Sequence, residues 1–265
     1  MIQPSLLIST YNWPTALAAV LATVRRQRVL PLEVLIADDG SRDDTAALVR
    51  AAQSTFPVPL RHYWQPDEGF RKTRILNEAL AHAAGDYVIQ VDGDILLHPE
   101  FVASHMRCAA PGWYLQGSRV MLSEALTARC IAQQEIPSHP VFAAGVRNRI
   151  NAIHAPLLAG LVRGPRDAIK RTRGCNVSFW KSDLFAVNGW NEAFEGWGRE
   201  DPELAARLQN SGVRRRNLKF LAVAFHLEHR RASAAAVAGQ HEQLLETIAS
   251  GRRVCERGVA QHRAP

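Results

Sequence analysis

The stretch VIQVDGDILL, residues 88–97, places two carboxylates at the end of an apolar run, with one glycine between them. Two acids this close repel each other unless a cation or hydrogen-bond donors compensate, and a divalent metal is the simplest compensation. Gly93 lets the backbone turn sharply, so Asp92 and Asp94 need not point to opposite sides as in a regular strand. Taken alone, the tripeptide is better explained as a turn, so the surrounding sequence has to decide.

Short apolar runs alternate with helix-like segments over the first hundred residues. This order predicts βαβ units with parallel strands and helices on both faces, which is an α/β fold. Asp38 and Asp39 follow one expected strand, as Asp92 and Asp94 follow another, and ligands of open α/β sheets collect at such strand ends. The expected strands are 5–9, 32–37, 60–64 and 87–91, and the expected helices are 13–27, 43–53 and 72–83.

The second half of the chain is less regular. Residues 138–173 mix prolines, glycines and arginines with apolar residues, which predicts a long loop or helical flap over the site. Regular structure is expected again from Gly174, and Pro202 suits the first turn of a helix. The expected strands here are 174–180 and 219–227, and the expected helices are 181–188, 202–209 and 233–250.

The composition fits a folded chain with anionic partners. Its 265 residues are 47% hydrophobic, enough for one large domain or two packed lobes. A net charge of +7 and a pI near 9.7 favour nucleic acid, anionic lipid or phosphorylated small molecules as partners. The N-terminus lacks a basic leader, and no segment approaches the roughly 20 apolar residues of a membrane span, so we expect a soluble cytoplasmic protein. Four well-separated cysteines are expected to stay reduced.

Two further segments carry residues suited to chemistry. In WGRED, residues 197–201, two acids precede a helix, where exposed N–H groups favour carboxylates, so capping is one explanation of Asp201. The alternative is a general base at Asp201, with Glu200 and Trp197 orienting an acceptor. His226 and His229 near a strand end are explained either as packed side chains or as metal ligands. Oxygen ligands with one imidazole suit Mn²⁺ better than Mg²⁺.

Together these segments resemble a family 2 glycosyltransferase with the GT-A fold, over most of the chain from Pro4 to about Arg230. Residues 9–14 and 37–43 are similar to the family's opening strand and nucleotide site, 68–77 to the segment that passes the uridine and diphosphate, and 92–94 to its D-x-D metal motif. Residues 176–179 and 196–201 are similar to a C-terminal galactosyltransferase-type module, also found in chondroitin-polymerase-like bacterial enzymes. Arg199 departs from the glycine usual in that module.

The resemblance implies a single catalytic domain over residues 1–230, built on a Rossmann-like, mostly parallel central sheet flanked by helices. Residues 1–100 would be its nucleotide-binding half. Residues 101–230 would be its acceptor-binding and catalytic half, with the flap at about 138–173. Residues 231–265 would form a C-terminal helical extension.

The resemblance also implies roles for individual residues. Asp94 and His226 would hold a divalent metal, Mn²⁺ in preference to Mg²⁺, with Asp92 and His229 as weaker candidates. Asp201 would be the catalytic base, assisted by Glu200. The acceptor-binding residues would be Asn176, Trp197 and Glu200. The nucleotide-sugar-binding residues would be Thr10, Tyr11, Asn12, Asp38, Asp39, Arg71, Lys72, Arg74, Asn77 and Asp92.

The function implied is inverting transfer of a sugar from a nucleotide-sugar, a UDP-sugar by preference, to a hydroxyl of a glycan or lipid-linked acceptor in bacterial surface polysaccharide biosynthesis. We hypothesise that residues 143–173 contact the anionic inner face of the cytoplasmic membrane, where such an acceptor would reside.

The sequence has neither Gly-x-Gly-x-x-Gly after the first strand nor the motif Gly-x-x-x-x-Gly-Lys-Ser/Thr, so neither a dinucleotide site nor a P-loop is supported. A metal-dependent nucleotidyltransferase or phosphohydrolase, and a basic nucleic-acid-binding protein, are the alternatives.

Overall fold

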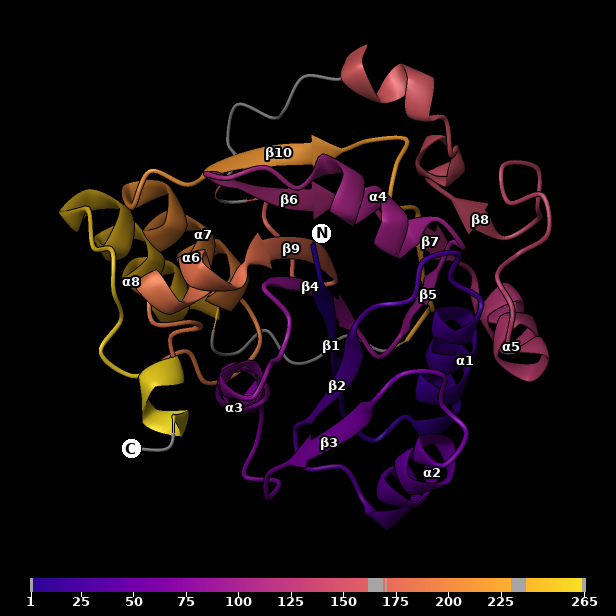
Figure 1. The fold of residues 1–265 in the computed structure, drawn as a ribbon, viewed down its shortest axis with the longest axis horizontal. Coiled ribbons are helices and arrows are strands. Elements are labelled where there is room, and N and C mark those ends of the chain that lie inside the picture. The colour runs from indigo at the N-terminus through magenta and orange to yellow at the C-terminus, as the bar shows by residue number, and fades with distance from the viewer. Residues whose placement is uncertain (1, 162–168, 170, 230–236, 264–265) are drawn as a thin grey trace.

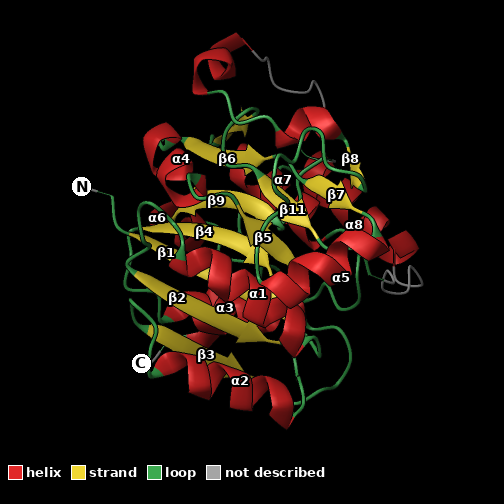
Figure 2. Cartoon of the chain, turned by 90° about the vertical axis from the view of Figure 1, so that its right-hand side faces the viewer, coloured by secondary structure: helices red, strands yellow, loops and turns green. Residues whose placement is uncertain are grey.

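The computed structural model describes residues 2–161, 169, 171–229 and 237–263. These residues form two sheets, and the larger of the two is the central sheet of the fold. The strand order is β10-β6-β9-β4-β1-β2-β3, and only β9 runs antiparallel to its neighbours. In Figure 2 the order can be followed from β6 down to β3. These strands are β1 (Pro4–Thr10), β2 (Glu33–Asp38), β3 (Leu60–Trp64), β4 (Tyr87–Asp92), β6 (Trp113–Gly117), β9 (Asn176–Trp180) and β10 (Arg214–Leu218).

A smaller sheet, of order β5-β11-β7-β8, follows the end of β4. Its strands are β5 (Ile95–Leu97), β7 (Val120–Leu122), β8 (Val146–Arg147) and β11 (Ala224–His226). The helices of the described residues are α1 (Pro14–Arg25), α2 (Asp43–Gln53), α3 (Lys72–Ala81), α4 (Phe101–Cys108), α5 (Glu124–Gln133), α6 (Lys181–Ala186), α7 (Glu200–Asn210) and α8 (Val237–Ser250), with 3-10 turns at Arg149–Ala152, Pro156–Leu161 and Val259–His262.

Helices cover both faces of the larger sheet, because successive strand residues point to opposite sides. Leu6 and Ile8 of β1 lie in one buried apolar cluster with α1, α2, α4 and α5, whereas Leu7 lies in a second cluster with α3, α6 and α7. Figure 1 shows these two sets of helices on opposite sides of the strands. The expected α/β fold with a mostly parallel sheet flanked by helices is therefore confirmed.

The expected strand at 219–227 is wrong over most of its length. Phe220 and Ala222 have φ angles of 63° and 43°, so the chain turns there and only Ala224–His226 is a strand. Residues Arg214–Leu218, which we did not predict as a strand, form β10 at the edge of the larger sheet. The guanidinium carbons of Arg214 and Arg216 lie 4.2 and 4.9 Å from the ring centroid of Trp113, so an aromatic neighbour lets this charged segment pair as a strand.

Several helix boundaries also differ from expectation, among them those of α7 and α6. Helix α7 begins at Glu200, two residues before the predicted start at Pro202, so both acids of the WGRED segment lie in its first turn. Proline is tolerated there because the first N–H groups of a helix have no partner within it. Helix α6 ends at Ala186, and the chain then turns through the left-handed residues Asn188 and Gly189, with φ of 63° and 66°.

Part of the predicted flap forms regular secondary structure. Within 138–161 it contains β8 and two 3-10 turns, and β8 pairs with β7. Residues 162–168 and 170 of the predicted flap lie outside the described residues, as do 230–236 next to the predicted domain boundary. The four cysteines are free thiols. None of the helices in the described ranges is long and apolar enough to cross a bilayer.

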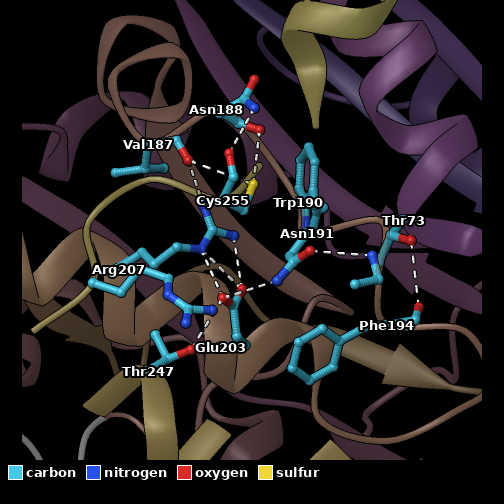
Figure 3. Close-up of polar contacts among 12 residues, drawn as sticks. Thr73, Val187, Asn188, Trp190, Asn191, Phe194, Glu203, Arg207, Thr247 and Cys255 are labelled. Atoms are coloured by element: carbon cyan, nitrogen blue, oxygen red, sulfur yellow. Dashed lines mark hydrogen bonds and ion pairs between the residues drawn. The ribbon is translucent and has the colours of Figure 1, made fainter. Parts of the chain in front are cut away.

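A buried ion pair anchors α7. The carboxylate of Glu203 accepts from the Nε and NH2 groups of Arg207 at 2.8 to 2.9 Å, and both side chains are fully buried. Figure 3 shows Thr247 of α8 beside the carboxylate of Glu203, and its hydroxyl lies 3.5 Å from Glu203 Oε1. Arg207 NH1 also donates to the carbonyl of Val187 at 2.5 Å. The pair thus joins α7 to α8 and to the end of α6.

We predict that Glu203→Gln lowers the free energy of unfolding by about 3–5 kcal/mol, because it leaves the Arg207 charge buried without its partner. Urea denaturation measures this change. The matched control is Glu246→Gln, which removes an exposed ion pair with Arg252 and should cost less than about 1 kcal/mol. Equal costs for the two variants would show that the buried pair does not anchor α7.

Candidate active site

The predicted acidic residues meet at the carboxyl edge of the sheet. The parallel registers place Thr10 opposite Asp38 and Ser9 opposite Asp92. The backbone continues this contact past the strand ends, because Asp39 N–H donates to Thr10 O at 3.0 Å and Gly93 N–H to Ser9 O at 2.7 Å. Residues from three separate segments therefore form one edge, as the strand-end argument predicted.

Asp38 and Asp39 differ in their surroundings. Both oxygens of Asp38 are engaged within the fold, by the Ser41 N–H at 2.8 Å and the His62 ring at 2.9 Å. Asp39 accepts from the Gln65 amide at 2.6 Å and the Arg71 N–H at 3.0 Å. Burial raises the pKa of Asp39 to about 6, although these two donors oppose the shift.

The chain after β1 is held in a fixed path beside this pair. Asn12 has a left-handed φ of 46°, and its N–H donates to the Ser41 hydroxyl at 2.8 Å. The Tyr11 side chain is 53% exposed, and its hydroxyl donates to Asp67 at 2.9 Å. An exposed ring beside Asp39 is suited to stacking against a flat ligand.

Asp94, His226 and His229 form a group that could hold a metal. One ligand atom from each lies within 4.8 Å of the others. Asp94 Oδ2 is 2.9 Å from His229 Nε2 and 3.6 Å from His226 Nε2. His229, which we predicted as the weaker metal ligand, therefore lies closer to Asp94. Asp94 Oδ1 and His226 Nδ1 are buried without a hydrogen-bond partner. Since such atoms are costly to bury, the donor set fits a divalent cation.

Asp92 is not part of this group of three. Its Oδ1 accepts from the Ser9 hydroxyl at 2.8 Å and from the Lys72 ammonium at 2.6 Å. Burial acts to raise the pKa of Asp92, but Lys72 holds it below its ordinary value. Burial likewise acts to lower the pKa of Lys72, but Asp92, Asp201 and Glu200 raise it overall. Lys72 therefore stays protonated among three carboxylates.

Asp201 does not cap its own helix. Its Oδ2 accepts the N–H of Gly174, 27 residues away, at 2.6 Å. A Cβ on Gly174 would lie 2.4 Å from Gln90 Nε2 and 2.6 Å from Asp201 Oδ1, so a side chain here would have to displace these two groups. Burial and the neighbouring Glu200 raise the pKa of Asp201 to about 7, although Lys72 opposes them. A carboxyl with that pKa is suited to accept a proton near neutral pH.

Two predicted site residues are buried in other contacts. Asn77 is fully buried, and its amide donates to Trp190 O and Glu192. Asn176 is also fully buried and donates to the carbonyls of Ser118 and Ala222. Each amide thus joins segments of the fold. The roles of Asn77 in nucleotide-sugar binding and of Asn176 in acceptor binding stay predictions.

The remaining predicted residues lie around the edge. Trp197 is 42% exposed, and Glu200 accepts the Gly198 N–H at 3.0 Å. Arg71 and Arg74 line a cavity of about 340 Å³ together with Glu192 and Glu195. A larger cavity of about 650 Å³ lies under the flap, and none of the predicted site residues lines it.

Three residues that shape the site were not predicted. Gln65 binds Asp39, Ser9 binds Asp92, and Gly174 binds Asp201. Gln65 directly follows β3, so the same strand-end argument that selected the acids could have found it. The contact of Gly174 with Asp201 depends on tertiary structure, and no local signal marks it.

Solved structures place this arrangement in a class. The chain is similar to Staphylococcus aureus TarS 1–349 in complex with UDP-GlcNAc, with a TM-score of 0.64 and 16% identity over 98% of this chain and 69% of that one. It is also similar to the mannosyltransferase PcManGT from Pyrobaculum calidifontis in complex with GDP-Man and Mn²⁺, with a TM-score of 0.57 and 17% identity over 94% and 74%. The fold is that of the GT-A glycosyltransferases.

Sequence comparison gives the family. Residues 5–121 match glycosyl transferase family 2, and residues 161–230 match the N-terminal domain of galactosyltransferase. Chondroitin synthase of Escherichia coli is 28% identical over 242 residues, which are 84% of this chain and 34% of that protein. Residues 5–121 therefore belong to glycosyl transferase family 2, as the resemblance implied, and these matches support glycosyl transfer over the two alternatives. The chain spans about a third of the length of chondroitin synthase.

We predict that Asp94→Asn weakens Mn²⁺ binding by more than the roughly 10- to 100-fold that loss of an outer-shell partner costs. Titration calorimetry with a manganese salt measures the affinity. Asp43→Asn is the matched control, because Asp43 is an exposed carboxylate at the start of α2. If Asp94→Asn binds Mn²⁺ as the wild type does, the three residues are not the metal site.

Proposed function

We propose that the chain is an inverting glycosyltransferase that moves a sugar from a UDP-sugar to a hydroxyl of a glycan or lipid-linked acceptor, with Asp201 as the general base. The observation that carries the proposal is the buried carboxyl of Asp201, which accepts the Gly174 N–H and has its pKa raised to about 7 near Glu200, Lys72 and Asp92. General bases are most effective when their pKa lies near the working pH.

The difficulty of the reaction is the negative charge that grows on the nucleoside diphosphate as it leaves. A divalent cation held by Asp94, His226 and His229 would supply positive charge to that leaving group. Mn²⁺ is proposed over Mg²⁺, since two imidazoles suit it better. Lys72 stays charged beside Asp92 and adds a positive potential to the same region. Asp201 would take the proton of the acceptor hydroxyl as that oxygen attacks the anomeric carbon.

The nucleoside is proposed to lie against Tyr11 and Asp39, where an exposed ring and a buried carboxyl follow neighbouring strands. Uridine is proposed because the solved relative TarS holds UDP-GlcNAc, whereas PcManGT holds GDP-Man. A thermal-shift comparison of UDP and GDP, each with Mn²⁺, separates the two bases. Greater stabilisation by GDP would overturn the choice of uridine.

We predict that Asp201→Asn keeps UDP and Mn²⁺ binding but lowers the rate of transfer by about 10²- to 10⁴-fold, because the amide cannot accept the proton. Calorimetry with UDP and a product assay by NMR measure the two quantities. The wild-type rate should fall as the pH drops below about 7, because protonation of Asp201 removes the base. A variant that turns over normally would show that another group is the base.

A membrane-associated acceptor is proposed from the flap. Phe142 and Leu157 are 84% and 97% exposed, and Ile150 is 58% exposed. Arg147 and Arg149 are exposed in the same segment. Apolar side chains with nearby cations are suited to the surface of an anionic bilayer.

We predict that the chain co-sediments with phosphatidylglycerol-containing vesicles more than with pure phosphatidylcholine vesicles. Changing Phe142 and Leu157 together to serine should reduce this binding, because it removes the exposed apolar side chains. Val254→Ser is the matched control, since Val254 is 52% exposed outside the flap. Equal sedimentation with both lipids would count against membrane contact.

A further inference from the structure

The first turns of α8 contact the turn that precedes the proposed base. The Gln240 amide donates from Nε2 to the carbonyls of Glu195 and Gly196 at 2.8 and 2.9 Å. Its Oε1 accepts the N–H of Arg199 at 3.0 Å. One side chain therefore binds both ends of the turn that carries Trp197.

The chemistry of these three bonds selects glutamine. Two carbonyls need N–H donors and the Arg199 N–H needs an acceptor, and a primary amide offers both within one planar group. Gln240 is 5% exposed, so water does not readily replace it. Glutamate would set a carboxylate against two carbonyl oxygens, and methionine would fill the space without any of the three bonds.

The contact reaches the base through Arg199. This residue is the N-cap of α7, and Asp201 lies two residues later in the first turn of that helix. The same turn is tied to the nucleotide-side segment, because Gly196 N–H donates to Phe70 O at 2.9 Å. Gly196 has a φ of 86°, a left-handed conformation that glycine adopts without steric cost.

We propose that Gln240 is a positioning residue that sets the start of α7, and with it Asp201 and Trp197, for transfer. This proposal rests on the proposed function and gives the C-terminal helix a role in it. Gln240 touches no reacting atom; it acts through the backbone of Glu195, Gly196 and Arg199.

Helix α8 has other anchors, so Gln240 can be changed without releasing it. Leu244 is fully buried, and the Thr247 hydroxyl binds Glu203 at 3.5 Å. The Asn210 amide of α7 donates to Thr247 O at 3.2 Å and to Arg252 O at 2.7 Å. A substitution at Gln240 is therefore a local change to the turn.

The test compares Gln240→Met and Gln240→Ala with Gln243→Ala, a control at an exposed position on the same helix. Hydrogen exchange of a peptide covering residues 195–201 should be faster in both Gln240 variants, because the Arg199 N–H loses its acceptor. The kcat should fall by on the order of ten- to a hundredfold, because a displaced catalytic group costs rate even far from the substitution. Affinity for UDP with Mn²⁺ should stay within about twofold, since no nucleotide-side contact is removed.

Two results would overturn the proposal. Unchanged exchange of residues 195–201 would show that Gln240 does not hold the turn. Faster exchange with an unchanged kcat would show that the turn does not position the base. If the wild type transfers no sugar, the proposed function fails, whereas the exchange of residues 195–201 still decides whether Gln240 holds the turn.

Discussion

The ion pair between Lys72 and Asp92 is the interaction on which the site depends. The two atoms are 2.6 Å apart, and the ammonium also faces Asp201 and Glu200. Without it, the nucleotide-side strand and the first turn of α7 would bring three acids together with no counter-charge. Helix α3 begins at Lys72, so the helix that covers one sheet face also supplies the cation for the sheet edge. The two acids of the DGD motif are thereby separated in role, since Asp92 is paired with Lys72 and Asp94 lies with two imidazoles.

The first half of the molecule could be predicted from sequence because its information is local. Alternating apolar runs fix the β1–β4 order, and acids after strands must meet where parallel strands end. The predicted pairing of Asp94 with a histidine from a distant strand relied on family resemblance, not on spacing. The choice between His226 and His229 depends on the path of the chain after β11, which no local pattern specifies.

Residues whose side chains serve tertiary contacts are predicted less well, in either half of the chain. Asn77 and Asn176 look like ligand-binding amides in the sequence, but each joins backbone segments inside the fold. Gly174 is the first residue of a predicted strand, but its importance lies in the space it leaves for Asp201. Arg207 of α7 is fully buried against Glu203, a pairing for which we made no prediction from the sequence. Such roles depend on contacts with residues that are distant in the sequence.

The contact between Gly174 and Asp201 has a stereochemical consequence. The backbone N–H takes one lone pair of Oδ2 at 2.6 Å, so it helps to fix the orientation of the carboxylate plane. The remaining lone pairs, including those of Oδ1, then point in directions set in part by a backbone group. Among several similar hydroxyls on an acceptor ring, the one that lies along such a direction would lose its proton. Regioselectivity in such an enzyme would be determined by the peptide plane behind the base as much as by the pocket around the sugar.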